Sequence, residues 1–384
     1  MKDRKKTISN VDVLIFVEDP GAANYVSQLP AELSYRYGLK TVILADGYAE
    51  TYLKERGCRV QTIEHPADAK KILSFYKPRL LMIGTSENAD TLGLKLVVDA
   101  RKAGIASIGI VDSLPNAFHR FRGREESPLA YAPDWLIVPD QWTKDEYTSI
   151  GYSDNKVIIC GHPHYDYVLS TANALEKEDR DALRKGLFPN IADDQKVATF
   201  VAEVSTGLNP EQYVFSNEYT LLGRGTSLGR TQIVLEEFLD AIKTIDSKLY
   251  MVLRLHPKNT VDEFKEYIND FNLVSASGPP LELIYASDLV VGMTTGLLLE
   301  AVIMGSPTLS IVPRRMEANW LPSIRMGLTP CATSREKIRS ELKSLLEQRM
   351  NKMNSIKAHQ LFWGSLERIT DCVSKIIAKS RNHS

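Results

Sequence analysis

The sequence is poor in cysteine and has almost no net charge for its 384 residues. Its 4 cysteines are scattered without a Cys-x-x-Cys pair, which argues against a zinc site and a disulfide framework. A formal net charge of −1 provides no basic field for nucleic acid, and no apolar run approaches the roughly 18 residues of a transmembrane helix. We therefore expect a cytoplasmic protein that binds no nucleic acid. Its contact with a membrane is expected to be at most peripheral, at the inner face.

The chain is too long for one ordinary core, and its length favours two domains. Short β-branched apolar runs alternate with helical segments from residue 11 to 159, and a second such series runs from 196 to 311. This alternation predicts parallel βαβ units. The predicted fold is therefore α/β, with two tandem Rossmann-like domains and a C-terminal helical region. We assign 1–165 to the first domain, 166–190 to a linker, 191–345 to the second domain and 346–384 to a helical tail.

The most informative segment runs from Leu253 to Pro313. It contains strand-like runs that end in RLHP, in MTTG and in PRR, and a predicted helix from Leu297 to Met304 follows the second of them. Backbone N–H groups and the helix dipole attract phosphate to a helix N-terminus, and Glu300, further along the helix, would suit a ribose. The segment thus predicts a nucleotide diphosphate site. The alternative is a plain α/β unit in which Thr294 or Thr295 is a helix N-cap.

Acidic residues follow two of the predicted strands in the first domain. Asp112 comes directly after SIGIV, and Glu18 and Asp19 come after the first strand, within EDPG. Ligands of open α/β sheets bind at the carboxyl ends of the strands, where desolvation can raise the pKa of a carboxyl group toward neutrality and suit it to act as a base. A turn or helix-cap role is the alternative for each acid.

A long segment from Glu203 to Arg230 follows the first strand of the second domain. Long loops in compact domains are often functional, and Ser205, Thr206 and Gly207 stand at its start, where hydroxyl and backbone donors would meet a phosphate. A mere insertion is the alternative.

Taken together, the elements GHPHYD, RLHP, SDLVVGMTTGLLLEA and GSP resemble glycosyltransferases of the GT-B fold. The resemblance is to polysialyltransferase and capsule enzymes and to CDP-glycerol glycerophosphotransferase-like enzymes, and more distantly to non-hydrolysing UDP-N-acetylglucosamine 2-epimerases. It implies that His256-Pro257 and Thr294-Thr295 hold the nucleotide phosphates and that Glu300 contacts the ribose. It also implies a carboxylate base in the first domain, for which EDPG, with Gly21, and Asp112 are the candidates.

The predicted function is a glycosyltransferase that moves a sugar, or a glycerophosphate-like group, from a nucleotide-activated donor to a glycan or cell-surface polysaccharide acceptor. We expect inversion, because the two glutamates separated by seven residues that many retaining GT-B enzymes carry are missing near this turn. We expect no metal and no cofactor besides the donor, because no Asp-x-Asp motif stands in a metal-binding context. The catalytic candidates are Asp112, Asp19 and Glu18, and the substrate-binding candidates are Arg254, His256, Pro257, Lys258, Thr294, Thr295, Gly296, Glu300, Ser205, Thr206, Gly207 and Gly21.

Two alternatives remain open. One is a UDP-sugar 2-epimerase-like enzyme, although enzymes of that family carry a DSGG-type turn where this chain has MTTG. The other is a non-catalytic nucleotide-sugar-binding subunit, which would keep the phosphate site and lose the base.

Overall fold

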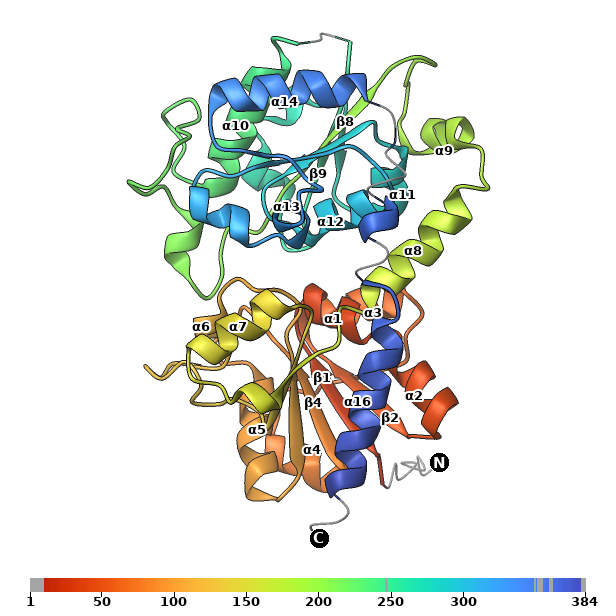
Figure 1. The fold of residues 1–384 in the computed structure, drawn as a ribbon, viewed down its shortest axis with the longest axis vertical. Helices are drawn as coiled ribbons and strands as arrows, with labels where there is room; N and C mark the ends of the chain where they lie inside the picture. Colours follow the sequence, from red (N-terminus) through yellow and green to blue (C-terminus); the bar gives the residue numbers. More distant parts are fainter. Residues whose placement is uncertain (1–9, 246–247, 349, 351–354, 359–361, 381–384) are drawn as a thin grey trace. The chain divides into compact units, whose positions relative to one another are not determined.

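The computed structural model describes residues 10–245, 248–348, 350, 355–358 and 362–380. These residues form two compact units (Figure 1). The first unit contains the described residues through Asp166 together with those from Gly364 onward, and the second runs from Tyr167 to Trp363. Each unit is built on a parallel sheet with helices. The predicted fold class, α/β with two Rossmann-like domains, is confirmed.

The sheet of the first unit has 7 parallel strands in the order β3-β2-β1-β4-β5-β6-β7. The strands are β1 (Val13–Val17), β2 (Thr41–Ala45), β3 (Val60–Thr62), β4 (Leu80–Gly84), β5 (Ala106–Ile110), β6 (Trp135–Val138) and β7 (Val157–Ile159). Their side chains are largely buried because helices cover a parallel sheet, which explains their continuous apolar runs. The strand order reverses between β1 and β4, so the carboxyl ends of these two strands form the switch point at which ligands of such sheets bind.

The helices of the first unit follow its strands in alternation. They are α1 (Pro20–Val26), α2 (Leu29–Tyr37), α3 (Gly47–Glu55), α4 (Ala69–Tyr76), α5 (Leu92–Lys102), α6 (Ala117–Arg120), α7 (Gln141–Ser149), the 3₁₀ turn η1 (Asp154–Lys156) and α16 (Ser365–Ser380). The chain returns from the second unit in α16 (Figure 1). Ile369 and Val373 of this helix belong to the same buried apolar cluster as Val13 and Ile15 of β1. The segment between β1 and β2 forms two helices rather than one, because Pro30 stands in the first turn of α2 and proline is tolerated there but not inside a helix.

The sheet of the second unit has 6 parallel strands in the order β10-β9-β8-β11-β12-β13. They are β8 (Val197–Val201), β9 (Tyr250–Arg254), β10 (Leu273–Ser275), β11 (Leu289–Gly292), β12 (Thr308–Ile311) and β13 (Cys331–Ala332). The order reverses between β8 and β11, which defines a second switch point. Val201 pairs with Arg254, and Gly292 pairs with Ser310, so the segments that follow these strands emerge at one edge.

The helices of the second unit are α9 (Arg180–Leu187), α10 (Arg230–Ile242), α11 (Pro280–Ala286), α12 (Gly296–Ile303), α13 (Pro322–Arg325) and α14 (Arg335–Glu347), with the 3₁₀ turns η2 (Pro210–Tyr213), η3 (Val261–Phe264), η4 (Ile268–Asp270) and η5 (Arg315–Asn319). In sequence, α8 (His164–Leu175) spans the boundary between the units. Phe238 of α10 and Ile338 of α14 share one core with Phe200 of β8. Among the described residues, no helix is long and apolar enough to cross a membrane.

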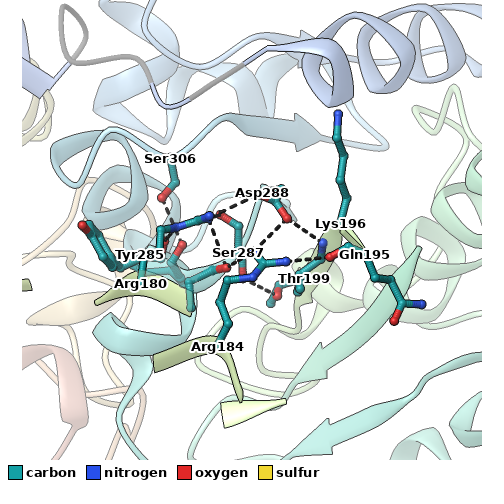
Figure 2. Close-up of polar contacts among 12 residues, drawn as sticks. Arg180, Arg184, Gln195, Lys196, Thr199, Tyr285, Ser287, Asp288 and Ser306 are labelled. Atoms are coloured by element: carbon teal, nitrogen blue, oxygen red, sulfur yellow. Dashed lines mark hydrogen bonds and ion pairs between the residues drawn. The ribbon is translucent and has the colours of Figure 1, made fainter. Parts of the chain in front are cut away.

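Two arginines of α9 fasten this helix to the amino ends of the central strands of the second unit (Figure 2). Arg184 donates to the carbonyl of Ala286 at 2.7 Å and to Asp288 Oδ2 at 2.9 Å, and Arg180 donates to the carbonyls of Ala286 and Ser287 and to Asp288, each at 3.2 Å. These carbonyls lie at the C-terminal end of α11, where helical carbonyls lack partners within the helix. Asp288 also accepts from the backbone N–H of Val197 at 2.8 Å. This cluster lies at the sheet edge opposite to the switch point.

We expect Arg184→Met to lower the free energy of unfolding by about 2 kcal/mol, because Ala286 and Asp288 lose a buried charged donor while Arg180 remains. Urea unfolding followed by circular dichroism measures the change. The control is Lys185→Met, whose neighbouring ion pair with Asp193 is 62% and 82% exposed and should contribute little. Equal stability of the two variants would contradict a fastening role for Arg184.

Candidate functional site

One segment at the switch point of the first unit holds all three acids that the sequence proposed as catalytic. Thr85 donates to Asp112 Oδ1 at 3.0 Å, and the backbone N–H of Glu87 donates to Asp19 Oδ2 at 2.6 Å. Glu18 accepts from the Ser86 hydroxyl at 3.3 Å and from the Asn88 amide at 2.8 Å. Because the segment 85–88 follows β4 while the acids follow β1 and β5, the register of the sheet brings them to one edge.

Gly21 is required by the position of Asp112. A methyl group added to Gly21 would lie 2.0 Å from Asp112 Oδ2, far inside van der Waals contact. The carboxylate therefore packs directly on the first turn of α1, which begins at Pro20. The structure thus brings Asp112 into contact with the EDPG element. The sequence analysis treated the two as competing candidates for the carboxylate base.

Arg120, from α6, anchors the segment that holds the acids. Its side chain is 8% exposed and pairs with Glu87 at 2.9 Å. Burial lowers the pKa of the guanidinium, but Glu87 and then Asp112 more than offset this effect, so the pKa of Arg120 is raised and its charge is retained. Arg120 therefore contributes a fixed positive charge beside the carboxylates. The sequence offered no signal for the pairing of Arg120 with Glu87, because α6 is short and irregular segments surround it.

At the switch point of the second unit, a carboxylate holds the turn that the sequence predicted to bind phosphate. Glu203, two residues beyond β8, accepts from the backbone N–H of Thr294 and, at 3.2 Å, from its hydroxyl. Thr295 is the N-cap of α12 and accepts from the N–H of Leu297 at 3.3 Å. Gly296 is exposed at the first position of the helix. The turn therefore has both the predicted N-cap and an acid that the sequence analysis did not assign.

Arg230 lies between two glutamates in the same place. It donates to Glu203 at 2.7 Å and to Glu317 at 2.9 and 2.5 Å, and its side chain is 1% exposed. Glu317, which is fully buried, also accepts from Arg314 at 2.5 Å. Burial lowers the pKa of Arg230, but Glu203 and Glu317 more than compensate and raise it. The four side chains form an ion quartet that joins β8, α10 and η5.

A second acid connects the segments after β8 and β9. Glu263 accepts from Ser205 at 3.0 Å and from Asn259 at 3.1 Å, and Asn259 in turn accepts from the backbone N–H of His256 at 3.1 Å. His256 Nδ1 accepts from the N–H of Lys258 at 3.1 Å, which assigns the proton of a neutral ring to Nε2. His256 is half-buried, and this arrangement gives its imidazole a defined orientation.

The other predicted binding residues are distributed around this edge. Glu300 is buried in α12, with Oε1 4.0 Å from where a methyl group on Gly296 would lie, and Pro257 and Thr206 are exposed. Arg254 instead holds the loop after β10, because it donates to Ser275, Ser277 and Gly278 at 2.5 to 3.0 Å. Gly207 lies half-buried beyond Ser205. In the described part of the chain, no group of three or more metal-ligating side chains is found.

Sequence reasoning missed Glu203, Glu317 and Glu87. Glu203 and Glu87 each stand two or three residues past a buried strand, so the rule that directed attention to Asp112 applied to them as well. Glu317 lies within η5, whose N-cap is Arg314, and it is farther past its strand, β12, than Glu203 or Glu87 is past the strand before it. Its role depends on Arg230 reaching it across 87 positions of sequence.

No protein-family model matches this chain, and no curated protein matches it. Among solved structures, it is similar to UDP-GlcNAc 2-epimerase from Neisseria meningitidis bound to UDP-GlcNAc, with a TM-score of 0.67, 15% identity and coverage of 95% of this chain and 100% of that one. The S. aureus MnaA–UDP complex has a TM-score of 0.67 at 12% identity, covering 96% and 97%. UDP-GlcNAc 2-epimerase from Methanocaldococcus jannaschii, in complex with UDP-GlcNAc and UDP, has a TM-score of 0.62 at 14% identity, covering 92% and 100%.

These structures share the two-unit GT-B architecture with the chain, and at such identities the similarity establishes the fold. They also correct the predicted function. The glycosyltransferase prediction is wrong, because structures similar over nearly the whole chain, those from Neisseria meningitidis and Methanocaldococcus jannaschii among them, are of UDP-GlcNAc 2-epimerases, the enzymes that the sequence analysis kept as an alternative. A resemblance to polysialyltransferases or CDP-glycerol transferases is not found among them.

We expect Arg230→Met to reduce the stability of the second unit by about 4 kcal/mol, because removal of one member of a buried ion network leaves its partners, here Glu203 and Glu317, without compensation. Chemical denaturation measures the loss. Arg224→Met is the matched control, since Arg224 pairs with Asp240 in a surface contact in which both side chains are about 40% exposed. A loss below about 1 kcal/mol for Arg230→Met would contradict the structural importance of the quartet.

Proposed function

We propose that the protein is an enzyme that acts on a UDP-linked amino sugar and inverts its C2 centre, as a UDP-GlcNAc 2-epimerase does. The observation that carries the proposal is the near-full-length similarity to 2-epimerase structures bound to UDP-GlcNAc and UDP. The arrangement of acids at one switch point and of hydroxyl, imidazole and backbone donors at the other supports it. An epimerase has a single substrate, so no glycan acceptor is part of the proposal.

C2 has no neighbouring carbonyl to take the electron pair of its C–H bond, so its proton can leave only as the C1–O bond to UDP breaks and a C1–C2 double bond forms. The bound UDP then re-adds at C1 while a proton is delivered to the opposite face of C2. This exchange takes a base and an acid within reach of the sugar, and carboxyl groups serve in both roles. Glu18, Asp19 and Asp112 supply three carboxyl groups at one edge, each oriented by donors of the segment 85–88. Asp112 is the principal candidate because its carboxylate is held by both Thr85 and the close packing of Gly21.

The nucleotide would be held by the second unit. The exposed first turn of α12, with Thr295 and Gly296, presents backbone donors at the positive end of the helix dipole. His256 stands two residues past the end of β9, which β8 separates from β11, and its Nε2 is a donor. Glu300 lies within the first turns of α12, where a carboxylate can accept from ribose hydroxyls. Neutral and backbone donors would thus carry most of the phosphate contact.

The direct test is to incubate the protein with UDP-GlcNAc in deuterated water and to record proton NMR spectra. We expect signals of the C2 epimer to appear and the C2 proton to be replaced by deuterium. Asp112→Asn should reduce turnover by about a hundredfold or more, the range for removal of a general acid or base, while calorimetric affinity for UDP-GlcNAc persists. His256→Ala should instead weaken affinity. Binding without exchange or epimerisation would leave a non-catalytic binder, and absence of binding would refute the assignment altogether.

Gly21→Ala gives an independent test of the acid cluster. The added methyl group displaces the Asp112 carboxylate, and we expect kcat to fall at least about tenfold, since such a displacement disturbs the geometry of proton transfer. The affinity for UDP-GlcNAc should change little. Gly186→Ala is the control, because a methyl group there meets no atom within 4 Å. Unchanged turnover in Gly21→Ala would show that Asp112 does not need this position for catalysis.

A further inference from the structure

Two of the cysteines, which lie far apart in the sequence, come together in the first unit. Cys160 directly follows β7, and Cys372 lies in α16, the helix in which the chain returns to this unit. Both are free thiols in the same buried apolar cluster, with exposures of 2% and 8%. No motif in the sequence indicated this pairing, because it depends on where α16 packs.

The contacts of Arg368 place the two thiols beside each other. The Cys160 thiol donates to the carbonyl of Arg368 at 3.9 Å, and Arg368 Nε donates to the carbonyl of Cys160 at 3.1 Å. Cys372 follows Arg368 by one turn of α16, so its backbone N–H donates to the same carbonyl. Side chains of a helix lean toward its N-terminus, which directs the Cys372 thiol toward Cys160. A hydrogen bond joins the two thiols.

The two thiols differ in acidity. The hydrogen bond from Cys160 lowers the pKa of Cys372, and the ammonium groups of Lys375 and Lys379 lower it further, although burial acts in the opposite direction. The same hydrogen bond, together with burial, raises the pKa of Cys160. Because the thiolate is the form that reacts with oxidants, Cys372 is the nucleophile of the pair and Cys160 is the thiol that stands ready to resolve its oxidised form.

We propose that Cys160 and Cys372 form a modification site, at which hydrogen peroxide converts the two thiols into a disulfide. The Cys372 thiolate attacks one peroxide oxygen, the O–O bond breaks, and a sulfenic acid forms while the departing hydroxide takes up a proton to become water. The sulfur of Cys160 then attacks the sulfenic sulfur, and the S–S bond forms as a second water leaves with the proton of Cys160. The two sulfurs lose two electrons, which reduce the peroxide.

The disulfide would fasten α16 to the end of β7. The chain leaves the first unit after Asp166 and returns at Gly364, and Asp166 accepts from the backbone N–H groups of Gly364 and Leu366, each at 2.9 Å. While the thiols are reduced, hydrogen bonds and apolar packing hold the helix. The disulfide would close a loop of sequence that contains the whole second unit, and cross-links that close long loops constrain the unfolded chain most. Oxidation should therefore oppose the detachment of α16.

The direct test treats the reduced full-length protein with hydrogen peroxide, blocks the remaining thiols by alkylation and digests the protein with trypsin without a reductant. The peptides 157–177 and 369–375, which contain one cysteine each, should appear joined, and the intact mass should fall by about 2 Da and recover with dithiothreitol. The double variant Cys58→Ser, Cys331→Ser should give the same linked peptide. Thiols at 160 and 372 that stay free, or that oxidise separately to sulfinic acids, would overturn the proposal.

Amide hydrogen exchange tests the fastening of α16. We expect exchange in α16 to slow by about tenfold or more on oxidation of the wild-type protein. Cys160→Ser, compared before and after the same peroxide treatment, should show no such change because it cannot form the bond. A linked peptide without slower exchange in α16 would refute the fastening, and slower exchange in Cys160→Ser would show that the disulfide is not its cause. None of these measurements depends on the proposed epimerase activity.

Discussion

The buried guanidinium of Arg230 is the interaction on which the second unit depends most. An arginine at 1% exposure is stable only when its charge is matched, and here Glu203 and Glu317 match it from two different parts of the chain. Because Glu203 also holds Thr294, the ion quartet determines the position of the turn that begins α12. The contacts that stabilise the core therefore also determine which charged groups lie beside the turn that is predicted to bind phosphate.

In the first unit, hydrogen-bond donors hold the acidic side chains in place. Its acids emerge from β1 and β5, and one segment after β4 offers each of them a hydroxyl, amide or backbone donor. Arg120 then fastens this segment through Glu87. Carboxylates that are oriented by hydrogen-bond donors beside the buried guanidinium of Arg120 are suited to proton transfer, because their geometry is held in place.

The glycosyltransferase prediction was wrong because short sequence motifs carry information about a ligand more than about the reaction. RLHP and the hydroxyl-rich turn before α12 led to the prediction of a nucleotide site, and enzymes that share one architecture can hold a similar ligand while catalysing different reactions. The motifs are therefore informative about the ligand half of the problem and say little about the reaction, which depends on where the acids stand relative to the sugar. Similarity over nearly the whole chain is what favours epimerisation over transfer in the proposed function.

The sequence by itself determined the α/β class, the alternation of strands and helices, and the strand ends that carry Asp112, Asp19 and His256, because parallel strands have continuous apolar runs and their ends are marked by polar residues. The tertiary structure decided which of these residues meet. It turned Arg254 toward the loop after β10, packed Asp112 on Gly21, returned the C-terminal helix to the first unit, and placed Glu203 and Glu317 on Arg230. Contacts of this kind join positions that lie, for example, 23 residues apart for Arg254 and Ser277 and 91 apart for Glu203 and Thr294. No local periodicity records them, since they arise only when strand order brings separate segments to one sheet edge.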